Sequence, residues 1–544
     1  MSQHRRRVPA QKVKRRRAVV VTAFAATVAL GLGVGVWAST GGNGTAGPSG
    51  GRAAVSADSP SATPSPSRSY ALSEAPATVP AVRTHTAARG PGWRPARDHR
   101  VVVADPKLAA DGKLIAAELG MTYAGQKGDE RTGDLRLALG GGSGADPESY
   151  TMTVSGGRVN IIGPAAPGVF YGTRTLKQAV HGGATAPEGV VRDAPAKPVR
   201  GFMLDIARKN FTASWIEDRV RELGDLKYNE LGLHFSDDQG FRIQSDTHPE
   251  IVSKEHLSKA QVRKIIALAD SRHITVVPEI DSPGHLGAVI AAHPDLQLRN
   301  TRGVATRGAV DISKPAAARI VDDLLNEFAG LFPGKQWNLG GDEYQALTVP
   351  DPAASFPQLA SAAREAYGSG GTVSDLATGW LNDRADTIRA HDRTMRAWND
   401  GFLKGTSVQP AEDLRVAYWT GKEIGARQPV EYLSTGRKLI NYNDEYLYYV
   451  LGQPNTFVYP TGQRIYEQWT PLVVRGTTPV PAKYDGQILG GTFAVWCDLA
   501  NSQTQDQVAA GIRMPLAATA QKLWDSGRPA LSWTEFKALA ARVA

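Results

Sequence analysis

The stretch Trp337-Asn338-Leu339-Gly340-Gly341-Asp342-Glu343 runs from apolar residues through two glycines into two adjacent carboxylates. It predicts a buried strand that ends at the glycines, because glycine has no Cβ and lets the chain leave strand geometry. Neighbouring side chains on a continuing strand point to opposite faces. Asp342 and Glu343 can therefore serve one site only if the strand stops at the glycines. The alternative is a solvated acid pair that caps the next helix, since acids are common before helices.

Strand-like and helix-like segments alternate from Arg200 to the C-terminus. The strand candidates are residues 201–206, 230–235, 274–280, 336–339, 394–398, 415–419, 438–442 and 488–496. Several are apolar along their whole length, as strands buried on both faces are. Helical stretches such as 216–226, 259–272 and 316–332 lie between them. About eight such units favour a closed (β/α)8 TIM barrel, class α/β, over an open doubly wound sheet, and we assign it to residues 198–544.

Three further regions precede the predicted barrel. Residues 98–197 combine short alternating strands with amphipathic helices, which predicts a small α/β domain that holds no cluster of polar groups. Residues 40–97 are rich in Pro, Ser, Thr and Gly and have few large apolar residues, which predicts a disordered linker. Residues 1–39 hold a basic run that ends at Arg17 and an apolar stretch from Ala18 to Ala38, the pattern of a signal sequence or a signal anchor.

The net charge of the chain comes almost entirely from this N-terminal region. Residues 1–17 contain eight Lys or Arg and no acid, so removing them from the formal +9 leaves the rest at +1. A near-neutral body argues against nucleic acid as a partner. We expect the protein to be secreted or anchored at the outer face of the cell membrane, with membrane contact only through the N-terminal segment. Cys497 is the single cysteine, which excludes an intramolecular disulfide.

Polar or aromatic side chains follow almost every predicted barrel strand, where the active sites of such barrels lie. In chain order they are Asp205, Arg208, His234, Asp237, Asp238, Glu279, Asp281, His285, Asp342, Glu343, Trp398, Asp400, Trp419, Tyr442, Asp444, Trp496 and Asp498. A tryptophan alone is more often a core residue, but tryptophans and carboxylates at one barrel mouth suit a carbohydrate ligand.

A metal site is the alternative for part of this set, because His234, Asp237, Asp281 and His285 are ligand types. No close pair of histidines with His-x-His or His-x-x-x-His spacing supports it. We therefore expect no metal at the mouth of the barrel.

Four motifs resemble the signature of the family 20 glycoside hydrolases, the β-N-acetylhexosaminidases and their relatives. They are RGFMLDIAR at 200–208, HFSDDQGFR at 234–242, PEIDSPGH at 278–285 and GGDE at 340–343. The resemblance covers about Val101 to the C-terminus. It implies a barrel preceded by a small α/β domain, and an enzyme without a cofactor.

The resemblance also implies a mechanism, a retaining hydrolysis in which the 2-acetamido oxygen of the substrate attacks the anomeric carbon. Glu343 is then the general acid and base, and Asp342 orients the acetamido group and balances the charge of the oxazolinium-like intermediate. A general acid must be protonated before the bond breaks, so we expect a raised pKa for Glu343.

The remaining site residues also follow from the resemblance. The supporting residues are His285, Asp281 and Asp237. The substrate-binding residues are Arg200 for ring hydroxyls, Trp398, Trp419 and Trp496 as walls of the acetamide pocket, Tyr442 for the acetamide carbonyl, and Asp444 and Asp498 for other hydroxyls.

Two positions depart from the family pattern. Asn338 stands where the family often has His, and Asp498, in Trp496-Cys497-Asp498, stands where it usually has Glu. A side chain shorter by one methylene reaches less far toward the distal hydroxyls of a sugar.

Three functions follow for an exported protein that acts on N-acetylhexosamine-containing oligosaccharides or glycoconjugates. We expect a β-N-acetylhexosaminidase that removes terminal β-linked GlcNAc or GalNAc, because one methylene in a site is usually worth only ~1–3 kcal/mol. The first alternative is a disaccharide-releasing enzyme of lacto-N-biosidase type. The second, a catalytically inactive surface carbohydrate-binding protein, is disfavoured because both Asp342 and Glu343 are retained.

Overall fold

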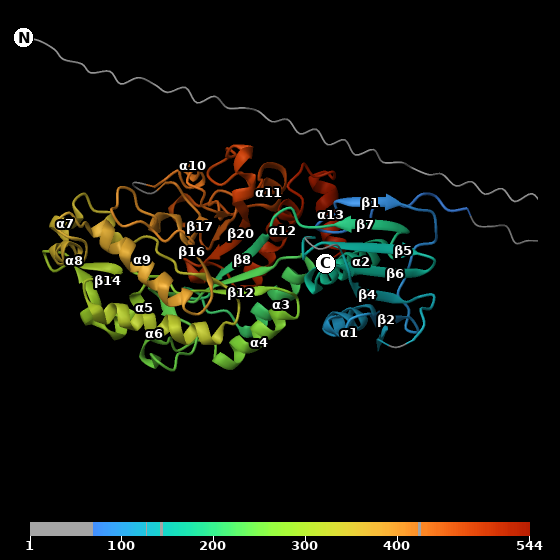
Figure 1. The fold of residues 1–544 in the computed structure, drawn as a ribbon, viewed down its shortest axis with the longest axis horizontal. Helices are drawn as coiled ribbons and strands as arrows, with labels where there is room; N and C mark the ends of the chain where they lie inside the picture. Colours follow the sequence, from blue (N-terminus) through green and yellow to red (C-terminus); the bar gives the residue numbers. More distant parts are fainter. Residues whose placement is uncertain (1–68, 127, 142–144, 423–425, 544) are drawn as a thin grey trace, which may run out of the picture. The chain divides into compact units, whose positions relative to one another are not determined.

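The computed structural model describes residues 69–126, 128–141, 145–422 and 426–543, which belong to one compact unit (Figure 1). The predicted signal or anchor segment at residues 1–39 lies outside the described residues, as do residues 40–68 of the predicted linker. Among the residues that are described, no helix has both the length and the apolar character needed to cross a membrane.

A seven-stranded sheet with two helices packed on it forms the small domain. The strand order is β1-β7-β5-β6-β4-β2-β3. The strands are β1 (Thr84–Ala87), β2 (Arg100–Val103), β3 (Thr122–Gly125), β4 (Leu135–Leu139), β5 (Tyr150–Ser155), β6 (Arg158–Gly163) and β7 (Gly189–Asp193), and the helices are α1 (Ala109–Leu119) and α2 (Ala166–Gly183). Alternating strand residues such as Val101, Leu137 and Ile161 form its core with Phe170 of α2. The predicted small α/β domain is confirmed.

The predicted start of this domain at residue 98 is wrong, because the fold begins inside the stretch that we assigned to the linker. Strand β1 pairs antiparallel with β7, with Thr84 opposite Arg192. Trp93 is buried, and its indole nitrogen donates to the carbonyl of Gly133 at 3.1 Å. The polar composition of residues 69–97 hid these contacts, since the buried side chains there are few and far apart in sequence.

Eight parallel strands form the barrel. They are β8 (Val199–Asp205), β9 (Glu230–His234), β12 (Thr275–Glu279), β15 (Gln336–Asn338), β16 (Thr394–Trp398), β17 (Arg415–Tyr418), β18 (Leu439–Asn441) and β20 (Ile488–Trp496). Each pairs with the next in this order, and β20 closes the ring by pairing with both β18 and β8. All seven residues of β8 are buried, as expected for a strand covered on both faces. The predicted TIM barrel is confirmed.

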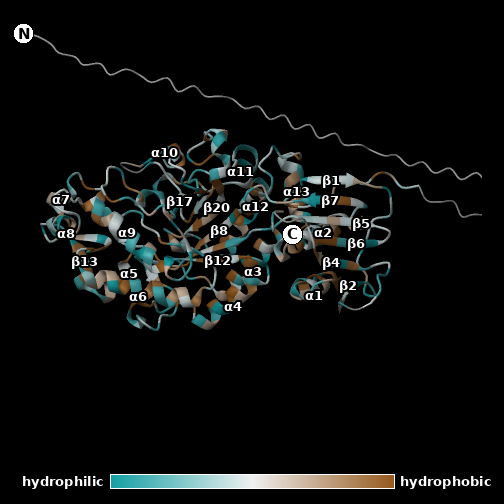
Figure 2. Cartoon of the chain, viewed as in Figure 1, coloured by the Kyte–Doolittle hydropathy of each residue, from teal (hydrophilic) through white to brown (hydrophobic). Residues whose placement is uncertain are grey.

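Most of the remaining helices surround the barrel (Figure 1), and their residues mix hydrophobic and hydrophilic types (Figure 2). In α6, for example, Ile320, Leu324 and Phe328 recur at helical spacing and are buried. The helices are α3 (Ala213–Asp225), α4 (Lys259–Asp270), α5 (Gly287–Ala292), α6 (Pro315–Leu331), α7 (Pro352–Ser355), α8 (Pro357–Tyr367), α9 (Val373–Arg389), α10 (Pro429–Leu433), α11 (Gly462–Gln468), α12 (Gln505–Trp524) and α13 (Trp533–Val543).

Short additional strands lie in the connections that follow the barrel strands. They are β10 (Ser236–Asp237), β11 (Gly240–Phe241), β13 (Gln297–Arg299), β14 (Ala305–Val310) and β19 (Tyr448–Val450). Strand β19 pairs with the last residues of β20, so it extends the sheet on the side where the barrel opens. The loops at this end carry the candidate site.

Candidate active site

The loop after β15 presents the two adjacent carboxylates. Gly340 and Gly341 have φ values of 68° and 95°, in the left-handed region that favours glycine. A Cβ on Gly340 would lie 1.9 Å from Oδ1 of Asp281, so no larger residue fits. The amide of Gly341 donates to the same Oδ1 at 2.6 Å. The strand therefore stops at the glycines, and the turn brings Asp342 and Glu343 to the same cavity.

That cavity has a volume of about 1090 Å³ and lies at the C-terminal ends of the barrel strands. Among the predicted site residues, Asp237, His285, Asp342, Glu343, Trp419, Asp444, Trp496 and Asp498 line it. Further lining residues include Arg208, Asp238, Arg307, Lys422, Tyr448, Phe457 and Arg464. The structure thus brings side chains from seven barrel strands and their loops to one opening.

His285 links the acid pair to a buried carboxylate. Its Nε2 lies 3.3 Å from Oε2 of Glu343 and 3.7 Å from Oδ2 of Asp342, and its Nδ1 lies 3.3 Å from Oδ1 of Asp237. Burial disfavours the charged ring, but Asp237 and Asp342 raise the pKa of His285 well above its usual value. Burial likewise opposes ionisation of Asp237, yet His285, His234 and Arg208 hold its pKa well below the usual range. An imidazolium at His285 therefore lies between three carboxyl groups.

Asp281 and Asp342 form a close carboxyl pair, with one oxygen of each within 4.8 Å of the other. Burial and the neighbouring Asp342 raise the pKa of Asp281 well above its usual value. Burial also raises the pKa of Asp342, although the charge of His285 opposes this rise. Two carboxyl groups this close cannot both ionise easily, so one proton is shared and resides on the more buried Asp281. Asp342 can then remain the charged partner that faces the cavity.

The pKa of Glu343 is lowered, whereas the sequence predicted a raised pKa. The hydrogen bond from His285 lowers the pKa of Glu343, and partial burial only opposes this effect. The side chain is 46% exposed, so desolvation is weaker here than the sequence suggested. Nε2 of His285 lies 3.3 Å from the Glu343 carboxylate, near enough to exchange a proton with it.

Asp400 fixes the backbone of the catalytic loop. Its carboxylate accepts the amide of Glu343 at 3.0 Å and the indole Nε1 of Trp419 at 3.0 Å. Burial and the nearby Asp342 raise the pKa of Asp400 to about 8. Glu343 has a φ of 48°, which is uncommon for a residue with a side chain, and this hydrogen bond helps to hold it there.

Two stacked aromatic rings form one wall of the cavity. Trp419 and Tyr448 lie 5.8 Å apart between centroids with ring planes 4° apart. The ring centroids of Trp496 and Tyr448 are 5.8 Å apart. The guanidinium carbon of Arg208 lies over the Trp496 ring, 5.4 Å from its centroid. Nζ of Lys422 forms an ion pair with Oδ2 of Asp444 at 2.7 Å. Flat aromatic faces beside charged groups suit the C–H faces and hydroxyls of a sugar.

Trp398 and Tyr442 do not line the cavity. Trp398 is 1% exposed and donates through Nε1 to Oε1 of Glu279 at 3.0 Å, in a layer beneath Trp496. Tyr442 lies deeper still, against a small internal cavity of the barrel that Arg396 and other strand residues enclose. Tyr442 therefore cannot hold an acetamide carbonyl in the predicted way.

Tyr448 is the tyrosine at the cavity, and the sequence prediction missed it. It lies on the added strand β19, where it stacks on Trp419 and contacts Trp496. Its position follows from the pairing of Tyr448 with Ala494, which could not be read from the Tyr-x-Asp spacing of Tyr442 and Asp444. The cluster of tyrosines at 446, 448 and 449 is the one signal in the sequence that could have marked this segment.

Arg200 also lies away from the cavity. It stands near the start of β8, where its guanidinium nitrogens pair with Glu148 at 2.7 and 2.8 Å and donate to the hydroxyl of Tyr171 at 3.0 Å. These partners belong to the small domain, so Arg200 joins the two domains. Five residues separate it from the end of β8, a rise of roughly 16 Å at ~3.3 Å per residue, so it cannot reach the sugar site.

Arg208, unlike Arg200, lines the cavity. It follows the C-terminal end of β8 and pairs with Asp205 at 3.0 Å and with Asp237 at 2.8 Å. Both arginines belong to the same motif, RGFMLDIAR. The direction of the strand decides between them, because only its C-terminal end opens into the cavity.

Buried hydrogen bonds beneath the cavity hold its floor. Glu279 accepts from His234 Nδ1 at 2.9 Å, from Trp398 Nε1 at 3.0 Å and from Asn338 Nδ2 at 2.7 Å. The Oδ1 of Asn338 also accepts the amide of Gly340 at 3.2 Å. Asn338, the departure from the family pattern, thus still supports the glycine turn.

Both domains match models of one known protein family. The profile "Glycosyl hydrolase family 20, catalytic domain" matches residues 198–526, and "Glycosyl hydrolase family 20, domain 2" matches residues 75–194. The second match also begins before residue 98, in agreement with the position of β1.

Similar proteins cover much of the chain. A lacto-N-biosidase of Bifidobacterium bifidum is 29% identical over 472 residues, which are 85% of this chain and 41% of that protein. A beta-N-acetylhexosaminidase of Cellulomonas fimi is 31% identical over 293 residues, 49% of this chain and 59% of that protein. The chain thus spans less than two thirds of the length of these relatives.

Solved structures share the fold. A mutant Streptomyces plicatus beta-hexosaminidase in complex with product (GlcNAc) is 25% identical, with a TM-score of 0.68 over 88% of this chain and 95% of that one.

Proposed function

The chain belongs to glycosyl hydrolase family 20, and we propose that it hydrolyses the β-glycosidic bond of terminal N-acetylhexosamine (GlcNAc or GalNAc) with retention of configuration. One observation carries the proposal: Asp342 and Glu343 enter one cavity from a single glycine turn, and His285 bridges them. Hydrolysis of a glycosidic bond needs an acid for the leaving oxygen and a stabiliser for the sugar cation. These two carboxylates supply both roles.

The proposed reaction has two steps. In the first, the acetamido oxygen of the substrate attacks the anomeric carbon, the leaving oxygen takes a proton from Glu343, and Asp342 balances the positive oxazolinium. His285 lies close enough to supply that proton to Glu343. In the second step, Glu343 takes a proton from water, which attacks the anomeric carbon and reopens the ring to the acetamide. The shared proton on Asp281 keeps Asp342 anionic while the charge develops.

Release of a disaccharide is the second candidate, and the size of the cavity favours it. Its volume of about 1090 Å³ slightly exceeds the roughly 300–1,000 Å³ typical of sites for drug-sized ligands, which leaves space beyond one sugar ring. Asp498 lines this cavity and is exposed. The relative that covers 85% of this chain is a lacto-N-biosidase.

Product analysis separates the two candidates. Monosaccharide release predicts free N-acetylglucosamine from chitobiose and no lacto-N-biose from lacto-N-tetraose, because one missing methylene at Asp498 is worth only ~1–3 kcal/mol. Chromatography of the two digests gives the answer. Lacto-N-biose as the main product, with chitobiose intact, would replace the first candidate by the second. In that case Asp498→Glu, which restores the longer side chain, should lower disaccharide release more than hydrolysis of an aryl N-acetylglucosaminide.

We also propose that the protein is exported, on the evidence of the basic run and apolar stretch within residues 1–39. Fractionation of producing cells should place the activity in the medium or on the outer membrane face, and deletion of residues 18–38 should retain it inside. N-terminal sequencing of the exported protein then distinguishes cleavage from anchoring. A full-length protein found only in the cytosol would contradict the proposal.

A further inference from the structure

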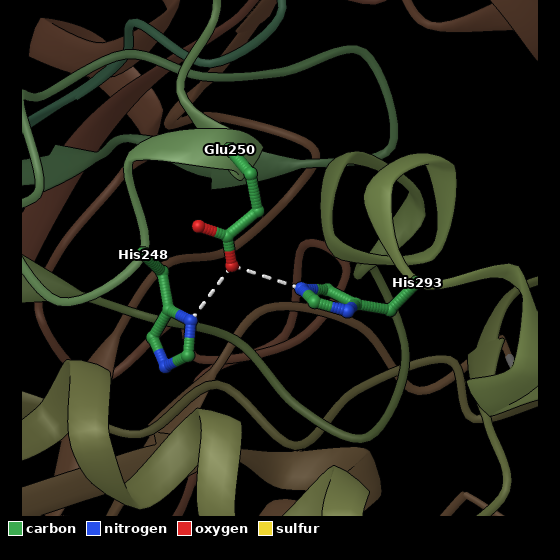
Figure 3. Close-up of side chains that lie close together, drawn as sticks. All are labelled: His248, Glu250 and His293. Atoms are coloured by element: carbon green, nitrogen blue, oxygen red, sulfur yellow. Dashed lines mark hydrogen bonds and ion pairs between the residues drawn. The ribbon is translucent and has the colours of Figure 1, made fainter.

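Three side chains outside the cavity meet on the flank of the barrel. Oε1 of Glu250 lies 2.9 Å from Nδ1 of His248 and 2.9 Å from Nε2 of His293 (Figure 3). Glu250 belongs to the short helix η2 (Pro249–Ile251), His248 directly precedes it, and His293 follows the last residue of α5. One atom from each residue lies within 4.8 Å of the other two. None of the three lines the cavity or contacts the acid pair.

Several hydrogen bonds fix the segment that carries His248. Glu327 of α6 accepts the hydroxyl of Ser245 at 2.6 Å and the amide of Asp246 at 2.7 Å. The amide of His248 donates to the hydroxyl of Ser245 at 3.0 Å. On the other side, the amide of His293 donates to the carbonyl of Val289 at 2.9 Å, so α5 fixes its backbone. The ligand atoms are therefore placed by two separate elements.

Asp323 of α6 gives a second, independent sign of a metal site. Its Oδ2 lies 3.5 Å from Nε2 of His248, the ring nitrogen that faces away from Glu250. This Nε2 is buried and has no hydrogen-bond partner among the described residues. Histidines that bind a metal through one ring nitrogen usually donate the other N–H to a carboxylate or carbonyl. Asp323 is placed to accept the N–H of His248 Nε2 in this way after a small side-chain shift.

We propose that His248, Glu250 and His293 bind a divalent transition-metal ion of the zinc class. Two imidazoles and one carboxylate suit Zn²⁺, Co²⁺ or Ni²⁺, whereas Ca²⁺ and Mg²⁺ prefer oxygen ligands alone. Ligands about 2.0–2.2 Å from one zinc ion lie roughly 3–3.5 Å from each other, so the observed separations need only small side-chain shifts. The exposure of Glu250 leaves the remaining coordination position open to water.

Metal binding needs only a change of tautomer in each histidine, with no net gain or loss of protons. The two nitrogens that face Glu250 act as donors to its Oε1 while no ion is bound. When an ion binds to these two nitrogens, each ring loses the proton there and takes up a proton on its other nitrogen, so each ring stays neutral. For His248 this nitrogen is Nε2, which faces Asp323.

The ion would tie the end of α5 to η2. Helix α5 begins at Gly287, two residues after His285 of the candidate active site. We therefore expect the metal to stabilise the fold around that loop and to take no part in the reaction. The proposal does not depend on which sugar the cavity accepts.

Zinc titration of the untagged full-length protein, freed of metal with a chelator, tests the site. Competition with a colorimetric zinc indicator should give one tightly bound Zn²⁺ per chain, and excess Mg²⁺ or Ca²⁺ should not displace it. Glu250→Gln and His293→Ala should each weaken binding by at least about 100-fold, and Asp323→Asn by about 10-fold, the scale on which partners of metal-bound histidines act. Co²⁺ in place of zinc should give a visible absorption spectrum that His293→Ala abolishes.

A matched control is His256→Ala, since His256 is exposed and bonds only its neighbouring backbone among the described residues. It should bind zinc like the unchanged protein. All variants should keep their hydrolytic rate, which shows that they fold. Zinc bound equally well after His293→Ala and Glu250→Gln would place the ion elsewhere, for example at Asp281, His285 and Asp342, and would overturn the proposal. Failure of the unchanged protein to bind Zn²⁺ more tightly than about 100 µM would overturn it too.

Discussion

Glu343→Gln is expected to lower kcat/KM for chitobiose by about 10²–10⁴-fold, the usual contribution of general acid–base catalysis. The amide has nearly the shape of the carboxylate but can neither deliver a proton to the leaving sugar nor remove one from water. An aryl glycoside with a nitrophenolate leaving group needs little protonation, so its bond cleavage should be affected much less. Steady-state rates on the two substrates measure the difference.

The low pKa of Glu343 sharpens this prediction. His285 lowers the pKa of Glu343 and lies 3.3 Å from its carboxylate, so in the proposed reaction His285 supplies the proton that Glu343 delivers. A glutamine at 343 breaks this transfer but leaves the cavity in place. Glu467→Gln is the matched control, since Glu467 is exposed and bonds only Gln463 among the described residues. Equal losses on chitobiose and on the aryl glycoside would rule out Glu343 as the acid.

Asp342→Asn should slow every substrate, by about 10²–10³-fold, the range seen when one stabilising group is lost from a transition state. The oxazolinium forms whatever the leaving group is, so its charge must always be balanced. The substitution also removes the acceptor of the Asp281 proton, and Asp281 is buried. Rates on chitobiose and on the aryl glycoside should therefore fall together.

The control for this variant is Asp218→Asn, a change at an exposed aspartate that pairs with Arg221 on the surface of α3. It should leave both rates unchanged. A loss confined to substrates with poor leaving groups would show that Asp342 acts in proton transfer instead. The contrast between the two variants thus assigns the two carboxylates to separate roles.

The barrel and the catalytic turn could be predicted because local sequence determines both. Strands such as β8 are buried along their whole length and mostly apolar, and the two glycines of the turn are required by their φ values and by the contact with Asp281. The structure likewise brings residues directly after strand ends, such as Asp237 and His285, to the cavity.

The errors occur where tertiary contacts decide the position. Arg200 and Arg208 share one motif, but only the direction of β8 shows which of them reaches the cavity. Tyr448 replaces Tyr442 because β19 pairs with the end of β20, a pairing between segments far apart in sequence. The pKa of Glu343 was also misjudged, since the sequence does not show how near His285 lies.

The folded start of the small domain was hidden for a similar reason. Strand β1 is exposed along most of its length, so its sequence lacks the alternation that marks a half-buried strand. Its backbone pairing with β7 holds it in the sheet. Composition alone could not separate this edge strand from the linker before it.

Inhibition by a thiazoline analogue of N-acetylglucosamine probes the proposed intermediate itself, because this compound copies the ring that the acetamide forms during the reaction. Substrate-assisted catalysis at Asp342 and Glu343 predicts competitive inhibition at least about 100-fold tighter than that by N-acetylglucosamine, as for other analogues of a transition state, and weaker inhibition of Asp342→Asn. A thiazoline that binds no better than N-acetylglucosamine would contradict substrate assistance.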